Sequence, residues 1–470
     1  MNLAVLALTT TGWMAGLYVG QMLRLDGTRI VLWFACGMSV ALLFRHRGAC
    51  VLLACGAGWM VGHSAIPPDD AVLRRLATDV ARCEVAGSLT ERAGAFGTLA
   101  RLETAGCEEG MFSGDLGSVI IDGAPGEPGS PFRATARFIP FGSDGFSEGR
   151  RRTGALAELD VLAISLGPPR GADALAAHVR GSARRSVSPL EDRSAALSLG
   201  LVIGDTSGFD PQTEESFRRA GLSHLVAVSG SNVAIVLGAV LLLGAQLHLW
   251  LRLGVAAAAL ALFVLVVGPE PSVLRAAAMG SVALWALALG RRTQPLQALC
   301  LACLGLSALR PQIVFSLGFW LSVAATLGIV LWASPISNSF EGWTRPGRLR
   351  TALAAAFGVT CSAQFAVAPL LALTFGTISV AGPPANLLAV PAVPPATILG
   401  FLAAVTGTIA APLGEMFARL SAPFLAWILW VADRFGTAPW ADVEVPRRAG
   451  ALLAAAVLGA ALISFREQEP

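Results

Sequence analysis

Residues 220–240 read AGLSHLVAVSGSNVAIVLGAV, and their length and polar centre set the class of protein. At a rise of about 1.5 Å per residue, this stretch is long enough to cross a membrane as a helix. Its middle nevertheless holds Ser229, Gly230, Ser231 and Asn232, where a span ordinarily has Leu or Val. Hydrocarbon offers no water to polar groups, so such a break is tolerated only where it is packed in protein or lines a wet cavity. We therefore predict a membrane protein whose lumen or binding site passes this break.

The composition of the whole chain agrees with that class. Of 470 residues, 54% are hydrophobic and 14% are charged, and the mean hydropathy is +0.65. These values are too apolar for a soluble protein of this size. The net charge of +3 decides little, because the distribution of charge along the chain matters more than the sum. The expected fold is a polytopic α-helical membrane protein in the cell (inner) membrane, with a small soluble domain inserted near the N-terminus.

Residues 190–466 form the predicted channel domain, a succession of apolar runs separated by short loops. Prolines interrupt its last third too often for simple spans, so we expect broken or re-entrant helices there and leave the number of spans after residue 376 open. The residues concerned are Gly382, Pro383, Pro384, Pro391, Pro394 and Pro395.

Residues 1–66 hold three further apolar segments and are predicted to be N-terminal transmembrane helices. Arg45, His46 and Arg47 lie between the second and third segments. By the positive-inside tendency that turn is cytoplasmic, which places the residues after Pro67 outside.

Residues 67–170 change character, with frequent charges, Gly and Pro and short alternating apolar runs. We predict an extracytoplasmic OB-like β domain with strands near residues 81–90, 96–102, 117–121, 132–139 and 160–166. A generic antiparallel sandwich fits the same pattern and stays open. Eleven Arg face fifteen Asp and Glu in this segment, so its charge of −4 makes it a poor binder of DNA phosphates by itself. Its Phe side chains could stack bases, but core packing is the commoner use.

Cys83 lies in the first predicted strand and Cys107 follows the second, so a hairpin could bring the two thiols together. Outside the cytoplasm a disulfide there is plausible, and two unpaired buried thiols are the alternative. Cys300 and Cys303 form a CxxC inside an apolar run, where small residues that help packing are a simpler explanation than a redox or metal role.

Residues 171–189 predict a basic amphipathic helix with Leu175 and Val179 on one side and His178, Arg180, Arg184 and Arg185 on another. Such a helix usually lies on anionic lipid headgroups, and a solvated linker is the alternative.

Several isolated polar residues in the channel domain need a partner or a wet path, because charge at the bilayer centre costs about 2.5–3.5 kcal/mol. Gln and Asn in lipid most often hold helices together, and His224 in a helix is as readily a satisfied core residue as a conducting one. Together they would also supply the lining that a polar polymer needs. The candidate channel-lining or motif residues are Asp205, Arg219, His224, Ser229, Gly230, Ser231, Asn232, Arg275, Gln364 and Asn386.

Catalytic chemistry is not expected. The five His residues never fall at a metal-ligand spacing, and no GxxxxGK[ST] phosphate loop occurs. Ser229 has no base at a helical spacing except His224, five residues away and on another face. We predict no enzyme activity, catalytic residue, metal or cofactor.

Four ordered motifs carry a family resemblance: GDTSGFDPQTEESFRRAGLSHLVAVSGSNVAIV (204–236), PSVLRAAAMG (271–280), RPQIVFSLGFWLSVAATLGIV (310–330) and FGTISVAGPPANLLAVP (375–391). This pattern resembles the competence region of the ComEC family of bacterial DNA-uptake proteins, and the soluble segment before it resembles that family's OB-like domain. The resemblance implies an inner-membrane channel that passes single-stranded DNA to the cytoplasm during natural transformation. It also implies membrane lipids, an outer DNA receptor and a cytoplasmic helicase-like motor as partners, and it leaves a homo-oligomer open.

Two departures from the family pattern matter. Many members read SGxHV in the central motif, whereas Asn232 stands here in place of a titratable His. Larger members carry a C-terminal metallo-β-lactamase-like domain, and no HxHxDH occurs in this sequence. Any strand degradation is therefore expected to need a separate nuclease. A carrier or lipid-handling membrane protein of the same fold is the alternative function.

Overall fold

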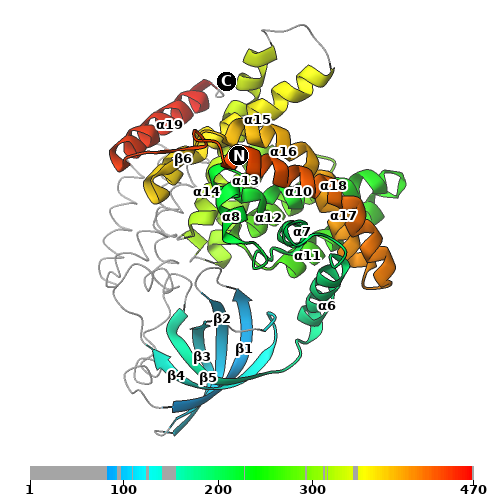
Figure 1. Ribbon diagram of the computed structural model, residues 1–470, viewed down its shortest axis with the longest axis vertical. Coiled ribbons are helices and arrows are strands. Elements are labelled where there is room, and N and C mark those ends of the chain that lie inside the picture. Colours follow the sequence, from blue (N-terminus) through cyan, green and yellow to red (C-terminus); the bar gives the residue numbers. More distant parts are fainter. Residues whose placement is uncertain are drawn as a thin grey trace. The chain divides into compact units, whose positions relative to one another are not determined.

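The computed structural model describes residues 82–92, 97–107, 110–122, 126–139, 155–226, 228–291, 294–310, 313–314, 316–341 and 348–467. The helices predicted over residues 1–66 lie outside this range. The chain divides into two compact units, and the boundary falls between Val179 and Arg180. The first unit takes in the described residues before it and residues 307–315; the second holds Arg180–Leu306 and the chain from Ser316 onward. Figure 1 shows the strands of the first unit in blue to cyan and the helices of the second unit in green to red.

Five strands of the first unit close into a barrel in the order β1-β2-β3-β5-β4. Neighbouring strands are antiparallel except β3 and β5, which run parallel, and β1 pairs with β4 to close the ring. The sequence predicted all five strands, and the closed ring differs from the open sandwich that was the alternative. The strands are β1 (Arg82–Arg92), β2 (Thr98–Cys107), β3 (Gly110–Ile121), β4 (Pro131–Ile139) and β5 (Ala155–Leu166).

Alternation of buried and exposed residues along each strand fills the barrel with apolar side chains. In β4, Phe132, Ala134, Ala136 and Phe138 point into the core, while Arg133 between them is exposed. The two phenylalanines are thus packing residues and are not available to stack bases. The other core members are Cys83, Val85, Leu89, Ala100, Leu102, Ala105, Val119, Ile121, Ala157 and Leu159.

The barrel needs a glycine where β1 bends. The register of β1 against β2 shifts between Ala86 and Gly87, as at a β-bulge. A Cβ at Gly87 would collide with the carbonyl oxygen of Arg101 on β2, so only glycine permits this close strand pairing.

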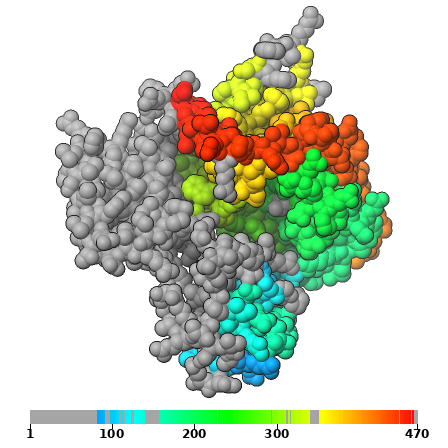
Figure 2. Space-filling model, turned by 60° about the vertical axis from the view of Figure 1, so that its left-hand side comes forward, coloured from blue at the N-terminus to red at the C-terminus, as the bar shows by residue number. Residues whose placement is uncertain are grey.

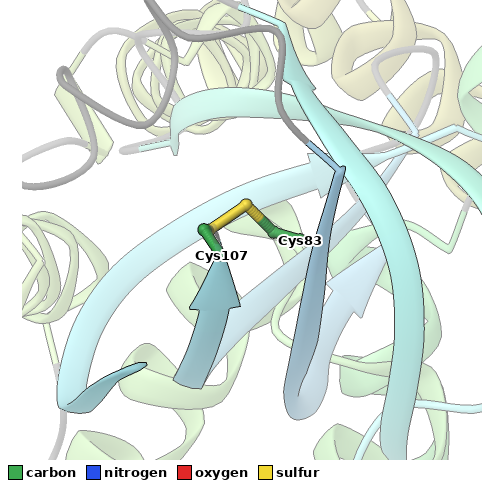
Figure 3. Close-up of a disulfide and its surroundings, with 2 residues drawn as sticks. All are labelled: Cys83 and Cys107. Atoms are coloured by element: carbon green, nitrogen blue, oxygen red, sulfur yellow. A yellow bond between two sulfur atoms is a disulfide. The ribbon is translucent and has the colours of Figure 1, made fainter. Parts of the chain in front are cut away.

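A disulfide joins Cys83 near the beginning of β1 to Cys107 at the end of β2 (Figure 3). The two Cα atoms lie 4.4 Å apart, and 24 positions separate them in the sequence. The predicted pairing is confirmed, and the bridge holds the first hairpin of the barrel closed at its open end.

The second unit is helical. Among the described residues, six segments are long and apolar enough to cross a membrane, so the chain is a multi-pass membrane protein. Its helices are α7 (Asp192–Ile203), α8 (Pro211–Arg219), α9 (Ser223–Val226), α10 (Gly230–Leu243), η2 (Gly244–Gln246), α11 (Leu249–Val267), α12 (Pro271–Ala288), α13 (Pro295–Leu309), α14 (Leu317–Glu341), α15 (Arg348–Phe375), α16 (Gly382–Ala389), η4 (Val390–Ala392), α17 (Val393–Thr406), α18 (Ala411–Gly436) and α19 (Arg447–Glu467). The short strands β6 (Thr377–Ser379) and β7 (Asp442–Glu444) pair antiparallel.

Glycine residues let the long helices α14 and α15 pack closely against each other. A Cβ at Gly328 on α14 would lie 2.6 Å from the carbonyl oxygen of Ser362, and one at Gly358 on α15 would lie 2.5 Å from that of Ala333. Both distances are below contact, so glycine at each position allows backbone-to-backbone packing. In lipid, where hydrophobicity does not drive helices together, such packing is a main source of association.

The Pro-rich residues of the last third lie in one helical segment that a 3-10 turn interrupts. Residues 382–406 form one apolar helical segment with a single 3-10 turn, η4, between α16 and α17. Pro383 and Pro394 stand in the first turns of α16 and α17, where a missing N–H leaves no intrahelical bond unmade. The 3-10 turn at Val390–Ala392 interrupts the α-helical pattern at Pro391, and that the segment is re-entrant stays a prediction.

Figure 2 shows α18 and α19 at the surface of the helical unit, as an orange-to-red band. On α18, Trp427 and Trp430 stack with ring centroids 5.0 Å apart, and both are exposed. Trp427 Nε1 donates to the carbonyl oxygen of Leu388 on α16 (2.9 Å). Exposed Trp pairs of this kind are typical of the membrane–water interface.

The predicted basic helix is α6 (Gly171–Ser186), and two of its arginines contact protein. Buried Arg180 donates through Nη1 to the carbonyl oxygens of Val266 (3.1 Å) and Leu265 (3.4 Å), at the C-terminal end of α11. A cation there complements the helix dipole. Arg184 pairs with Asp205 (3.0 Å), whereas Arg185 is exposed. Lipid contact by this helix stays a prediction, and Arg185 is the arginine that the fold leaves exposed for it.

Replacing Cys83 and Cys107 together by Ser should lower the free energy of unfolding of the barrel by about 3 kcal/mol, because the bridge no longer restricts the unfolded loop. The temperature at which barrel sites become accessible to protease, measured on the full chain in detergent, should fall. Cys361→Ser, at a free thiol on α15, is the matched control. Equal protease resistance of the two proteins, with no effect of reductant on the wild type, would contradict this role for the bridge.

Candidate functional site

The polar stretch at residues 229–232 marks an interruption between two helices. α9 ends at Val226 and α10 begins at Gly230, with Ser229 in extended conformation before it. Ser272 Oγ on α12 donates to the carbonyl oxygen of Val228 (3.1 Å), and the hydroxyls of Ser229 and Ser231 hydrogen-bond to each other. Ser231 is exposed and Ser229 half-buried. The break thus presents hydroxyls at the start of α10.

Asn232 has a different environment from the serines beside it. Its side chain is only 1% exposed, and Nδ2 donates to the carbonyl oxygen of Leu201 (3.1 Å) near the end of α7. Its Oδ1 is buried with no hydrogen-bond partner in the described chain. This contact joins α10 to α7, the helix-binding role usual for amides in lipid. That Asn232 lines a channel stays a prediction, and its burial does not favour it.

Arg275, near the start of α12, faces the break. Its side chain is 6% exposed; Nε donates to Ser322 Oγ on α14 (2.7 Å), and Nη1 lies 3.1 Å from Met279 Sδ. A Cβ on Gly230 would lie 2.7 Å from Nη2, so a larger residue at this position would displace the guanidinium from its place against α10. No carboxylate lies within ion-pair distance of Arg275 in the described residues.

We call Ser229, Gly230, Ser231, Arg275 and Ser322 the Arg275 junction. Gly230 is the first residue of α10, whereas Arg275 and Ser322 lie in the second turns of α12 and α14, so the N-terminus of α10 is the one shown beside the guanidinium in the described chain. A helix N-terminus carries partial positive charge. Together with the guanidinium it makes this junction electropositive.

A second group of polar residues connects α15, α16 and the loop before α9 by hydrogen bonds. Gln364 Nε2 donates to the carbonyl oxygen of Ser379 (3.1 Å), and Asn386 Nδ2 donates to that of Gly382 (2.8 Å) and lies 3.5 Å from that of Gly221. Ser379 Oγ donates to the carbonyl oxygen of Arg219 (2.8 Å). We call these residues the Gly221 junction, and in it the amides hold segments together.

Arg219 anchors the same junction to the loop before α19. Its Nε donates to Asp442 Oδ1 (3.1 Å) and its Nη2 to the carbonyl oxygen of Ala438 (3.1 Å). Asp442 pairs with Ser379 in the β6–β7 register, which places the ion pair beside the strand that carries Ser379. Arg219 is therefore fixed by protein on two sides.

Asp205 and His224 lie outside both junctions. Asp205, 8% exposed, accepts hydrogen bonds from Ser207 Oγ (2.6 Å), the Ser207 N–H (3.2 Å) and Arg184. Burial raises the pKa of the Asp205 carboxyl, but these hydrogen bonds outweigh burial, so the pKa lies below its ordinary value. His224 is exposed on α9, and its role stays a prediction.

The four sequence motifs therefore meet at two places. The first motif joins the second and third at the Arg275 junction, and it joins the fourth at the Gly221 junction. Sequence reasoning missed Ser272, Ser322, Ser379 and Asp442. Ser322 had a signal, since it is a hydroxyl within the apolar third motif. Among the described residues no group of three His, Cys, Asp or Glu could hold a metal ion.

These features define a multi-pass membrane protein with a small β-barrel and with its motif residues gathered at two junctions between apolar helices. A family model described as "Competence protein" matches residues 201–470, more than half of the chain, and the chain belongs to this family.

Two curated proteins are similar to it. ComE operon protein 3 of Bacillus subtilis (strain 168) is 28% identical over 250 residues, which cover 51% of this chain and 30% of that protein. Uncharacterized protein YcaI of Escherichia coli (strain K12) is 27% identical over 231 residues, 46% of this chain and 30% of that protein. The matched part is thus less than a third of each relative's length. No solved structure matches the chain.

Gly221→Ala should destabilise the helical unit more than Gly290→Ala. Both glycines have left-handed φ, +69° and +65°, so each alanine adds about 1 kcal/mol or more of backbone strain. At Gly221 the new Cβ would also lie 2.8 Å from Ser379 Oγ and 2.9 Å from Gly382 Cα, whereas at Gly290 nothing lies within 4 Å. Thermal unfolding in detergent measures both. Equal losses would mean that the Gly221 junction is not tightly packed.

Asp205→Asn should lower stability at pH 7 by on the order of 1 kcal/mol, since the charged hydrogen bonds are weakened. The folded pKa is below the unfolded one, so the carboxylate stabilises the fold above the unfolded value of about 4, and this is lost as the pH falls through the folded pKa. The difference in unfolding temperature between variant and wild type should therefore narrow below about pH 4. Arg184→Met should reproduce part of the effect, and a difference independent of pH would contradict this account.

Proposed function

We propose that this chain is an inner-membrane channel that passes single-stranded DNA into the cytoplasm during natural transformation. Family membership supports the DNA-uptake context. The observation that carries the channel assignment is the Arg275 junction, a helix break where half-buried Ser229 and exposed Ser231 lie beside a buried cation that has no carboxylate partner among the described residues. A charge in such a place usually marks the path of an ion or substrate, and DNA is a polyanion.

The path that we propose follows the Arg275 junction. Ser229 and Ser231 offer hydroxyls, and Gly230 leaves room beside the guanidinium. Asn232, Gln364 and Asn386 already donate to backbone carbonyls, so in this proposal they keep the helices around the path in place.

The barrel is proposed to be an OB-like domain outside the cytoplasm. Five strands in the order 1-2-3-5-4 with one parallel pair support the fold. The Cys83–Cys107 bridge supports the location, because structural disulfides persist mainly in oxidising compartments. With its acidic charge and buried Phe132 and Phe138, this barrel is proposed to guide or space the entrance and not to grip DNA.

Energy and DNA delivery would come from other proteins. The sequence has no phosphate-binding loop for nucleotide hydrolysis, so a cytoplasmic helicase-like motor is the proposed source of movement. An outer DNA receptor would deliver the substrate. We propose no enzymatic activity for the part of the chain described.

Gly230→Leu should abolish transformation while leaving membrane insertion intact, because a larger side chain at this position occupies the space beside Arg275. The measurement is uptake of labelled DNA and transformation frequency in a deletion strain complemented with each variant, with membrane levels followed by blot.

Gly238→Leu is the matched control, since Gly238 lies on the same helix, is exposed and has nothing within 4 Å of a new Cβ. It should transform as the wild type does. Normal transformation of the Gly230→Leu strain would refute the proposed path, and normal transformation of the deletion strain would refute the DNA-channel function and favour a carrier or lipid-handling role.

A further inference from the structure

Arg275 has no carboxylate partner among the described residues, although only 6% of the residue is exposed. Its described contacts are a hydroxyl and a thioether, both neutral. Nη2 donates to no group in the described chain and points at the first residue of α10. An enclosed guanidinium of this kind is costly unless an anion accompanies it.

The start of α10 supplies further donors toward the same place. The Ser229 side chain does not cap the helix but hydrogen-bonds to Ser231, and the backbone N–H groups of Gly230 and Ser231 make no hydrogen bond within the described chain. Free N–H groups at a helix N-terminus together with the helix dipole bind phosphate and carboxylate groups. Because residue 230 is glycine, no side chain separates these N–H groups from Nη2.

We infer that Arg275 and the N-terminus of α10 bind one phosphodiester group of the DNA strand. This inference rests on the proposed function for the identity of the ligand, but the site itself rests on the geometry. The guanidinium would donate through Nη2, the backbone through Gly230 and Ser231, and Ser322 would hold Nε so that the guanidinium plane stays oriented. None of these groups reads a base, so binding is independent of sequence.

A phospholipid headgroup has the same chemistry, and the surroundings of Arg275 favour DNA. The guanidinium is enclosed between α10, α12 and α14, and it contacts residues of all three helices. A headgroup with two acyl chains ordinarily lies on the lipid-facing surface of a helix bundle, whereas a phosphodiester of an extended strand can enter between helices.

The test is oligonucleotide binding to the full chain purified in detergent. The probes are a fluorescent oligothymidylate and the same oligomer with uncharged methylphosphonate linkages. The proteins are the wild type, Arg275→Met, Gly230→Ala, Arg275→Lys and the control Arg419→Met, which removes an exposed arginine of α18. Thermal unfolding confirms that each is folded. Co-purified phospholipid is measured on each protein.

Arg275→Met should bind the charged probe roughly ten- to hundredfold more weakly. The slope of log affinity against log salt should fall by about 0.7, the value for one phosphate contact on a single strand. Gly230→Ala should weaken binding with the arginine still present, Arg275→Lys should retain part of it, and Arg419→Met should be unchanged. The uncharged oligomer should bind all proteins equally weakly.

Equal affinity and salt slope for wild type and Arg275→Met would overturn the inference, as would equal binding of the charged and uncharged probes. Loss of co-purified phospholipid from Arg275→Met with unchanged oligonucleotide binding would also overturn it and assign the site to lipid. These outcomes are separate from the transformation assay. A deletion strain that transforms normally would refute the proposed transport, whereas the comparison of oligonucleotide affinities tests whether Arg275 and the start of α10 bind a phosphodiester.

Discussion

Polar groups between apolar helices must be satisfied within the protein, and the helical unit depends on that constraint. Several of its polar side chains meet it by donating to main-chain carbonyls: Asn232 to Leu201, Gln364 to Ser379, and Arg180 to Val266. These carbonyls lack an intrahelical donor or lie in short connecting segments, so each such bond satisfies two groups at once. Arg275 is the departure, since its charge meets only neutral groups, and it lies at the one break that the motifs share.

The local features of this fold were open to prediction because they depend on neighbouring residues. Alternation of apolar and polar residues predicted the strands that hold Val85, Phe132 and Leu159, and the hairpin spacing predicted the Cys83–Cys107 bridge. The break before α10 followed from four small polar residues in an apolar stretch. Each of these is a short-range signal, although the sandwich and the unpaired thiols stayed open as alternatives until the structure.

Which polar residues meet one another was not predictable, because it depends on the packing of distant segments. The sequence predicts Gln364, Asn386 and Asn232 as one set, but their contacts divide them: Gln364 and Asn386 belong to the Gly221 junction, while Asn232 contacts α7. Nothing in the sequence separates an amide that holds helices from one that faces water. The positions of Pro383 and Pro394 in the first turns of α16 and α17 were unpredictable for a related reason, since they depend on where each helix begins.

The use of carbonyls as acceptors has an evolutionary consequence. The hydrogen bonds from Asn386 to the Gly382 carbonyl and from Ser379 to the Arg219 carbonyl constrain the residue type only at the donor position. The acceptor is a backbone oxygen, which every amino acid has. The acceptor position can drift without a compensating change opposite it. Pairs of correlated substitutions would therefore not reveal these contacts. In homologues we expect an invariant donor residue at each contact, whereas a contact between two side chains would show two positions that change together.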